Sequence, residues 1–135
     1  MEDFLIEKKI YYHDTDCGGV VYYANYLKYL EEARTECLFG KGIDLQELSN
    51  KGIWFVVARV DIEYKTPARY QDTLRILTSV EKIKLSAIRF SQRILKGSST
   101  VAEAYTTLIC VGNDYRPLPI PEEIKNILEP LSRVH

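Results

Sequence analysis

The stretch HDTDCGGVVYYANYLKYLEEARTECL, residues 13–38, joins an acidic loop with two glycines directly to a helical pattern. From about Ala24 onward, apolar residues recur at steps of three and four, which is the period of an amphipathic helix. Gly40 and Gly42 follow, as is typical where a helix ends. The sequence therefore predicts one helix of about 25 Å that begins where the acidic loop ends.

The segments around this helix have the patterns of strands. Phe4–His13 mixes apolar and charged residues and predicts a first strand, whereas Ile43–Asn50 predicts a short helical turn. The period then changes to two. From this alternation we expect one face of the next strand to carry Trp54, Val56, Ala58, Val60, Ile62 and Tyr64, and the other face Arg59, Asp61, Glu63 and Lys65. Further strands are predicted at Thr73–Lys84, Leu85–Lys96 and Thr100–Val111, and a last short helix after Pro121.

The order of these elements predicts the fold class. A strand, a long helix and four consecutive strands indicate a five-stranded, mostly antiparallel sheet in a single α+β domain over residues 1–135. One helix cannot cover both faces of such a sheet. Apolar residues also occupy both faces of the last strand, at Leu108–Val111. We therefore expect a second copy of the chain to cover part of the sheet.

Composition excludes several classes of protein. The net charge is −1 and the pI about 6.1, so neither nucleic acid nor an anionic membrane surface is an expected partner. No leader peptide and no membrane-spanning run is predicted. Three widely spaced cysteines, Cys17, Cys37 and Cys110, argue against a disulfide framework and favour a cytoplasmic location.

The acidic loop is where chemistry is expected. Gly18 and Gly19 permit a close approach of ligand to backbone, and the helix start offers unpaired N–H groups. Together these are the parts of an oxyanion site, beside which Asp14 or Asp16 would act as nucleophile or general base. The residues alone leave a second interpretation open, because Asp and Thr before two glycines also form ordinary turns. His13 is either a further base or a hydrogen-bonded bystander.

Other types of site are poorly supported by the residues. No Lys-Ser or Lys-Thr follows the glycines, as a phosphate-binding loop would require, and no further ligands accompany the DTD run to form a metal site. No cofactor is expected. Glu31 and Arg34 are three residues apart on the predicted helix, where we expect a structural ion pair.

The quoted stretch resembles the opening of the YbgC-like acyl-CoA thioesterases, in the 4-hydroxybenzoyl-CoA thioesterase branch of the hotdog superfamily. The likeness continues through FVVARVDIEYKTPARYQDTL, FSQRI, VAEAYTTLICV and PIPEEI, so it covers nearly the whole chain. It implies a hotdog fold, in which a curved antiparallel sheet wraps a long central helix. It also implies dimers with sheets paired edge to edge, further association into tetramers, and active sites at the dimer interface.

The resemblance also implies roles for individual residues. Asp16 falls on the catalytic aspartate, with Asp14 as its structural neighbour, and the backbone N–H that polarises the thioester carbonyl falls on Tyr23. Coenzyme A is then part of the substrate, with acyl-carrier protein as an alternative carrier. The substrate-binding positions implied by the resemblance are Gly19, Val20, Asn25, Tyr26, Phe55, Val56 and Val57, together with Lys82 and Lys84 near the CoA phosphates.

The chain departs from the family pattern at two positions. Tyr23 stands where YbgC-like members commonly carry histidine, and His13 where they often carry glutamate. A backbone N–H is retained with any residue except proline at position 23. The expected activity is therefore hydrolysis of acyl-CoA thioesters, and the rival expectation is a non-catalytic acyl-CoA or acyl-carrier-protein binding module on the same fold.

Overall fold

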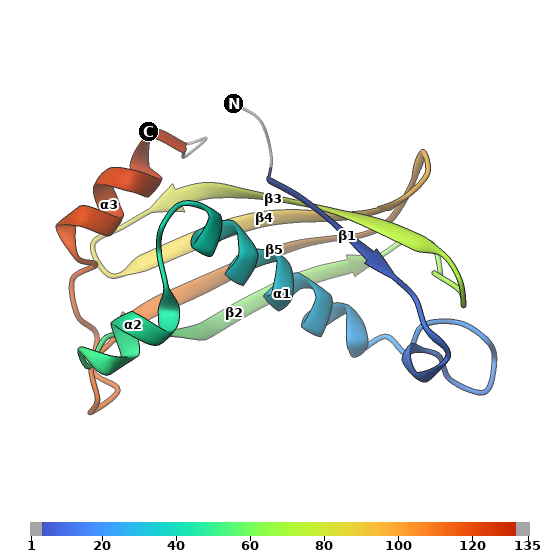
Figure 1. The fold of residues 1–135 in the computed structure, drawn as a ribbon, viewed down its shortest axis with the longest axis horizontal. Coiled ribbons are helices and arrows are strands. Elements are labelled where there is room, and N and C mark those ends of the chain that lie inside the picture. Colours follow the sequence, from blue (N-terminus) through green and yellow to red (C-terminus); the bar gives the residue numbers. More distant parts are fainter. Residues whose placement is uncertain (1–3, 132–135) are drawn as a thin grey trace.

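One long helix lies across one face of a five-stranded antiparallel sheet (Figure 1). The computed structural model describes residues 4–131. The strands are β1 (Phe4–Lys9), β2 (Trp54–Tyr64), β3 (Thr73–Ile83), β4 (Ala87–Lys96) and β5 (Ser99–Val111). The helices are α1 (Asn25–Gly40), α2 (Leu45–Asn50) and α3 (Glu122–Leu128), with 3-10 turns at Tyr12–Asp14 and Glu129–Leu131.

The sheet has the strand order β1-β3-β4-β5-β2, and every pair is antiparallel. The predicted α+β class is therefore confirmed, as are the long helix and four of the five strands to within a few residues. The first strand is shorter than predicted. It ends at Lys9, and the chain then turns through Tyr12–Asp14 because the Asp14 carboxylate accepts a hydrogen bond from the Tyr11 N–H at 2.8 Å.

Strand β2 contains a β-bulge that interrupts the predicted alternation of its two faces. The register against β5 shifts between Val57 and Arg59. Val60, Ile62 and Tyr64 share the helix-facing side, as predicted. Before the bulge the predicted faces are reversed, because Phe55 and Val57, not Trp54 and Val56, pair with the helix-facing residues of β5.

A buried polar network joins the middle of α1 to the sheet. The Gln92 side-chain amide donates to the Leu30 carbonyl and to the Thr78 hydroxyl, both at 2.9 Å. Arg34 is also buried, and its Nη1 donates to Gln92 at 3.1 Å and to Thr106 at 3.4 Å. The predicted Glu31–Arg34 ion pair does not form within the described chain, because the guanidinium turns inward to Gln92 and Thr106. Burial lowers the pKa of Arg34, although the Glu31 charge acts to raise it.

Strand β2 is an edge of the sheet and carries exposed apolar residues. It pairs with β5 on one side, and no described strand pairs with its other side. Val57 is 52% exposed and Val60 36%, although both lie on the helix-facing side. In Figure 1 α1 runs obliquely across the sheet and overlaps β2 only where the two cross. A long, apolar, unpaired edge of this kind is typical of a strand that pairs with another chain.

Candidate functional site

The acidic loop folds into a closed turn at one end of the molecule. Thr15 and Val21 form an isolated β-bridge across its base. Above the bridge, the Asp16 N–H donates to the Val20 carbonyl at 2.9 Å, and the Gly19 N–H donates to the Asp16 carbonyl at 3.0 Å. Gly19 has a φ of +79°, a conformation that glycine adopts without strain. The loop thus presents its tip to solvent while its base is fixed.

The Asp16 side chain lies on this tip and is exposed. Its Oδ1 accepts a hydrogen bond from the Gly18 N–H at 2.8 Å, and Oδ2 has no protein partner among residues 4–131. A Cβ on Gly18 would lie 3.2 Å from this Oδ1. Glycine at position 18 therefore leaves room for the carboxylate, which keeps one oxygen available to a ligand.

The Asp14 side chain is buried, in contrast to that of Asp16. Burial acts to raise the pKa of the Asp14 carboxyl group, but the hydrogen bond from the Tyr11 N–H, the Tyr29 hydroxyl, and the neighbouring His13 and Lys8 side chains outweigh it, so this pKa lies below its usual value. His13 Nε2 is 3.5 Å from the Asp14 carboxylate. The two acids therefore differ in surroundings, and His13 lies against Asp14.

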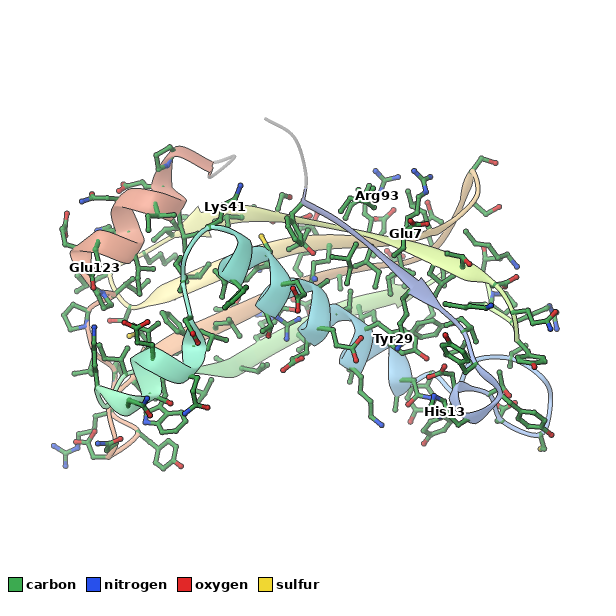
Figure 2. The ribbon with its side chains drawn as sticks, viewed as in Figure 1. Glu7, His13, Tyr29, Lys41, Arg93 and Glu123 are labelled. Carbon is green, nitrogen blue, oxygen red and sulfur yellow. The ribbon has the colours of Figure 1, made fainter. Side chains whose placement is uncertain are left out.

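Tyr29 also belongs to the surroundings of Asp14. Figure 2 shows Tyr29 on α1 close to the turn that carries His13. Its hydroxyl is buried and interacts with the Asp14 carboxylate. Burial and the Asp14 charge both raise the pKa of Tyr29, so it remains a neutral phenol near the buried carboxylate.

The start of α1 leaves two backbone N–H groups without an acceptor. The Asn25 N–H donates to the Tyr22 carbonyl at 2.9 Å and the Tyr26 N–H to the Tyr23 carbonyl at 3.3 Å. Within residues 4–131, neither the Tyr23 nor the Ala24 N–H donates to a protein acceptor, and no side chain caps the helix. Unpaired N–H groups at the start of a 16-residue helix form an environment that favours negative charge.

A hollow with aromatic walls lies beside these N–H groups. The Tyr23 and Tyr64 rings meet edge to face with centroids 6.1 Å apart, and the Tyr26 and Tyr64 rings are 5.7 Å apart. The Tyr26 hydroxyl accepts a hydrogen bond from the Ala68 N–H at 3.1 Å, which fixes that ring. Burial raises the pKa of both Tyr26 and Tyr64. The hollow is lined by Val21, Tyr23, Tyr26, Tyr64, Lys65, Thr66 and Pro67.

One chain brings together only some of the predicted site residues. Asp16, Gly19, Val20, Tyr23, Asn25 and Tyr26 all lie in the loop or at the start of α1. Phe55–Val57 lie at the opposite end of β2, about 25–30 Å along the strand from Tyr64. Lys82 and Lys84 lie at the far end of β3, also about 30 Å from the residues that contact the loop.

The far end has a hollow of its own. Lys82 and Lys84 have no acidic partner among the described residues, whereas Arg89 pairs with Glu81 at 3.3 Å and Arg59 with Asp61 at 2.9 Å. Four basic side chains near one another favour an anionic ligand. This second hollow is lined by Arg59, Glu81, Lys82, Lys84, Ala87, Arg89 and Thr107.

Comparison with known proteins assigns this chain to a family. The sequence matches the thioesterase-like superfamily over residues 11–128. The chain belongs to this superfamily. It is 37% identical over 118 residues to the acyl-CoA thioester hydrolase YbgC of Escherichia coli O6:H1, which covers 86% of this chain and 88% of that protein. The acyl-CoA thioesterase YbgC of Haemophilus influenzae is 36% identical over 124 residues, covering 90% and 91%.

A solved structure agrees with this assignment. A hypothetical protein of Aquifex aeolicus superposes with a TM-score of 0.88 at 30% identity, covering 93% of this chain and 98% of that one. The predicted hotdog fold and the YbgC-like resemblance are thus confirmed for this member of the thioesterase-like superfamily. None of its described helices is long and apolar enough to cross a bilayer, and residues 4–131 contain no cluster of three or more metal-ligating acids, histidines or cysteines.

Sequence reasoning missed part of this superfamily member's candidate site. Tyr64 was expected to share one face of its strand with Val60 and Ile62, but nothing in the alternation indicated that it meets Tyr23 and Tyr26 from another element. Arg59 and Arg89 were likewise not predicted to lie beside Lys82 and Lys84. The basic grouping arises from strand register, and the aromatic grouping arises from contact between the start of α1 and the end of β2.

Proposed function

We propose that this protein hydrolyses acyl-CoA thioesters, with Asp16 as nucleophile or general base and the Tyr23 N–H polarising the thioester carbonyl. One observation carries the proposal. In a chain of the thioesterase-like superfamily, an exposed carboxylate with an available oxygen lies on the loop that leads directly into a helix start with unpaired N–H groups.

The chemistry follows from these two groups. The carbonyl oxygen accepts a hydrogen bond from the Tyr23 N–H, so charge that develops on it faces the positive end of the helix dipole. Asp16 either attacks the carbonyl carbon to form an anhydride that water cleaves, or removes a proton from an attacking water. The C–S bond breaks, and the coenzyme A thiolate leaves and is protonated. This reaction requires no metal or redox cofactor.

A second copy of the chain would complete the site. Two β2 edges that pair antiparallel would bring the Phe55 end of one copy next to the Tyr64 end of the other, where the aromatic hollow lies. Val56 and Val57 follow along the same edge. The acyl pocket would thus take its walls from two chains, which supports a homodimer; the expected tetramer and cytoplasmic location stay predictions.

The basic hollow at the far end is suited to the carrier. Lys82 and Lys84, with Arg59 and Arg89 beside them, would hold the phosphate groups of coenzyme A. An acyl-carrier protein presents a single phosphate group on an acidic surface, and it stays an alternative carrier.

The deciding experiment is a thiol-release assay with a panel of short, long and aromatic acyl-CoA substrates. We expect release by the wild type and a loss of about 10²–10⁴-fold in kcat for Asp16→Asn, because the carboxylate is the reacting group. Asp114→Asn is the matched control. Asp114 also accepts a hydrogen bond from the N–H two residues later, at 3.1 Å from Arg116, but lies on another loop. Full activity of Asp16→Asn would overturn the assigned role, and affinity without any release by the wild type would favour the binding module.

A further inference from the structure

We propose that Asn25 is a positioning residue, which holds the catalytic loop and the helix start in one fixed arrangement through the Asp14 carbonyl. This inference rests on the proposed function and assigns how its two reacting groups are kept aligned. The Asn25 Nδ2 donates to the Asp14 carbonyl at 2.9 Å, and the Tyr22 N–H donates to the same oxygen at 3.0 Å. We call this arrangement the Asp14–Asn25 clasp.

The clasp spans the two groups that must stay in register. Asp16 lies two residues after Asp14, and Tyr23 lies two residues before Asn25. The two ends of the clasp therefore bracket both Asp16 and Tyr23 in the sequence. Its ends are eleven positions apart in the sequence, so without it the separation of the Asp16 carboxylate and the Tyr23 N–H would depend on the shorter-range hydrogen bonds within the loop.

The Asp14 end of the clasp is itself anchored. Its side chain is buried and accepts the Tyr11 N–H at 2.8 Å, so the carbonyl that receives both donors has little freedom to move. The helix end is anchored by the buried Tyr26 and Tyr29 side chains. Asn25 thus connects two rigid parts, and because its side chain lies at the first residue of α1, the helix packs without it.

This arrangement also gives a physical alternative to a substrate contact for Asn25. Its amide nitrogen is engaged within the protein, on a backbone carbonyl, while the adjacent Tyr23 and Ala24 N–H groups have no acceptor in the described chain. A positioning residue acts on the turnover step, whereas a substrate contact acts on binding. The two roles therefore differ in the kinetic constant that they affect.

The test uses two variants of the full-length protein. Asn25→Ala removes the donor without adding charge, and we expect kcat to fall about tenfold or more, with KM changed by less than about twofold, because a small misplacement of reacting groups is costly. Asn25→Asp has nearly the same shape but offers only acceptors to the Asp14 carbonyl. The first turn of α1 has no acidic residue, so the new carboxylate interacts favourably with the helix dipole. We therefore expect an unchanged or higher Tm together with a kcat lower than that of Asn25→Ala.

A second readout does not depend on activity. Hydrogen exchange of the Tyr22 amide, which shares the Asp14 carbonyl, should accelerate in both variants while exchange in the central strands stays unchanged. Asn50→Ala is the matched control. Asn50 accepts a hydrogen bond from Gln46 at 3.3 Å on α2, away from the loop, so its loss should change neither kcat nor the Tyr22 exchange rate.

Each outcome decides between roles. A raised KM at constant kcat would assign Asn25 to the substrate and overturn the clasp, as would wild-type kcat in both variants. A loss of kcat that follows a loss of Tm would show a merely structural role. If the wild type itself releases no thiol, the proposed function fails, but the Tyr22 exchange rate still tests the clasp.

Discussion

The two ends of the sheet differ in what they can do alone. The end that carries the acidic loop has an available carboxylate, unpaired N–H groups and an aromatic hollow. The opposite end has an apolar stretch at Phe55–Val57, of which Val57 is exposed, and a hollow with four basic side chains, but within residues 4–131 it has no comparable helix start. The proposed function thus assigns the reaction to one end of the sheet and recognition of the substrate to the other.

The separation indicates that a single chain carries two halves of different sites. In the proposed dimer, antiparallel pairing at β2 would invert one copy relative to the other, so that the proposed reacting end of each copy would meet the proposed recognition end of its partner. The sequence distance between Asp16 and Phe55 then has no bearing on how close the two residues lie in the assembly. Three predictions test this comparison.

The largest expected effect comes from mixing two inactive variants. Asp16→Asn removes the reacting group, and Val57→Trp fills the proposed acyl pocket from the far end while keeping the edge apolar. Each homodimer should lose about 10²–10⁴-fold in activity. A mixed dimer contains one intact site, because Asp16 and Val57 of that site come from different chains. After denaturation and refolding of an equal mixture, we expect about a quarter of wild-type activity to return.

The same mixture provides its own control. If Asp16 and Val57 served one site within one chain, mixing would restore nothing, because each chain would carry a damaged site. The absence of recovery in a mixture that size-exclusion chromatography and mass spectrometry show to contain hetero-dimers would contradict the division between ends.

A smaller effect is expected at the basic hollow. Replacing Lys82 and Lys84 together by Gln should raise KM for an acyl-CoA about tenfold and leave kcat unchanged, since two phosphate contacts are lost away from the reacting atoms. The difference from the wild type should shrink as salt concentration rises. Lys41→Gln, at an exposed lysine just after α1, is the control. An equal rise of KM in that variant would show that the effect is not specific to the basic hollow.

The smallest effect concerns the pH dependence of stability at the loop. The folded-state pKa of Asp14 lies below its ordinary value, so its charged form stabilises the folded protein above about pH 4, and this contribution is lost as pH falls through the folded-state pKa. Asp14→Asn should therefore cost about 1 kcal/mol at pH 7 and progressively less below pH 4. Urea unfolding at a series of pH values measures this. A difference that stays constant with pH would contradict it.

Much of the fold is readable from local patterns. Each helix and strand is specified by a period of apolar residues over consecutive positions, so α1 and the three consecutive strands after Thr73 were predicted closely. The clustering of Asp16, Gly19 and Tyr23 was equally accessible, because one loop and the helix that follows hold all of them.

The remaining features depend on contacts between distant segments. The bulge at Ala58 reverses the faces of β2, and no local pattern marks it. Arg34 turns inward because Gln92 and Thr106 offer acceptors from two other strands, and this inward position is why the local ion pair with Glu31 fails. The different burial of Asp14 and Asp16 follows from Tyr29 and the Tyr11 N–H, which flank only the first acid.

The unpaired edge of β2 also affects how the newly synthesised chain folds and assembles. A newly synthesised copy presents an eleven-residue strand with apolar residues and unpaired backbone groups, to which other extended chains can add. In the proposed dimer, pairing of two β2 edges is a bimolecular step that becomes slow at low protein concentration. We therefore expect the yield of native protein during expression to depend on how quickly copies meet, and charged substitutions on this edge to alter solubility as well as turnover.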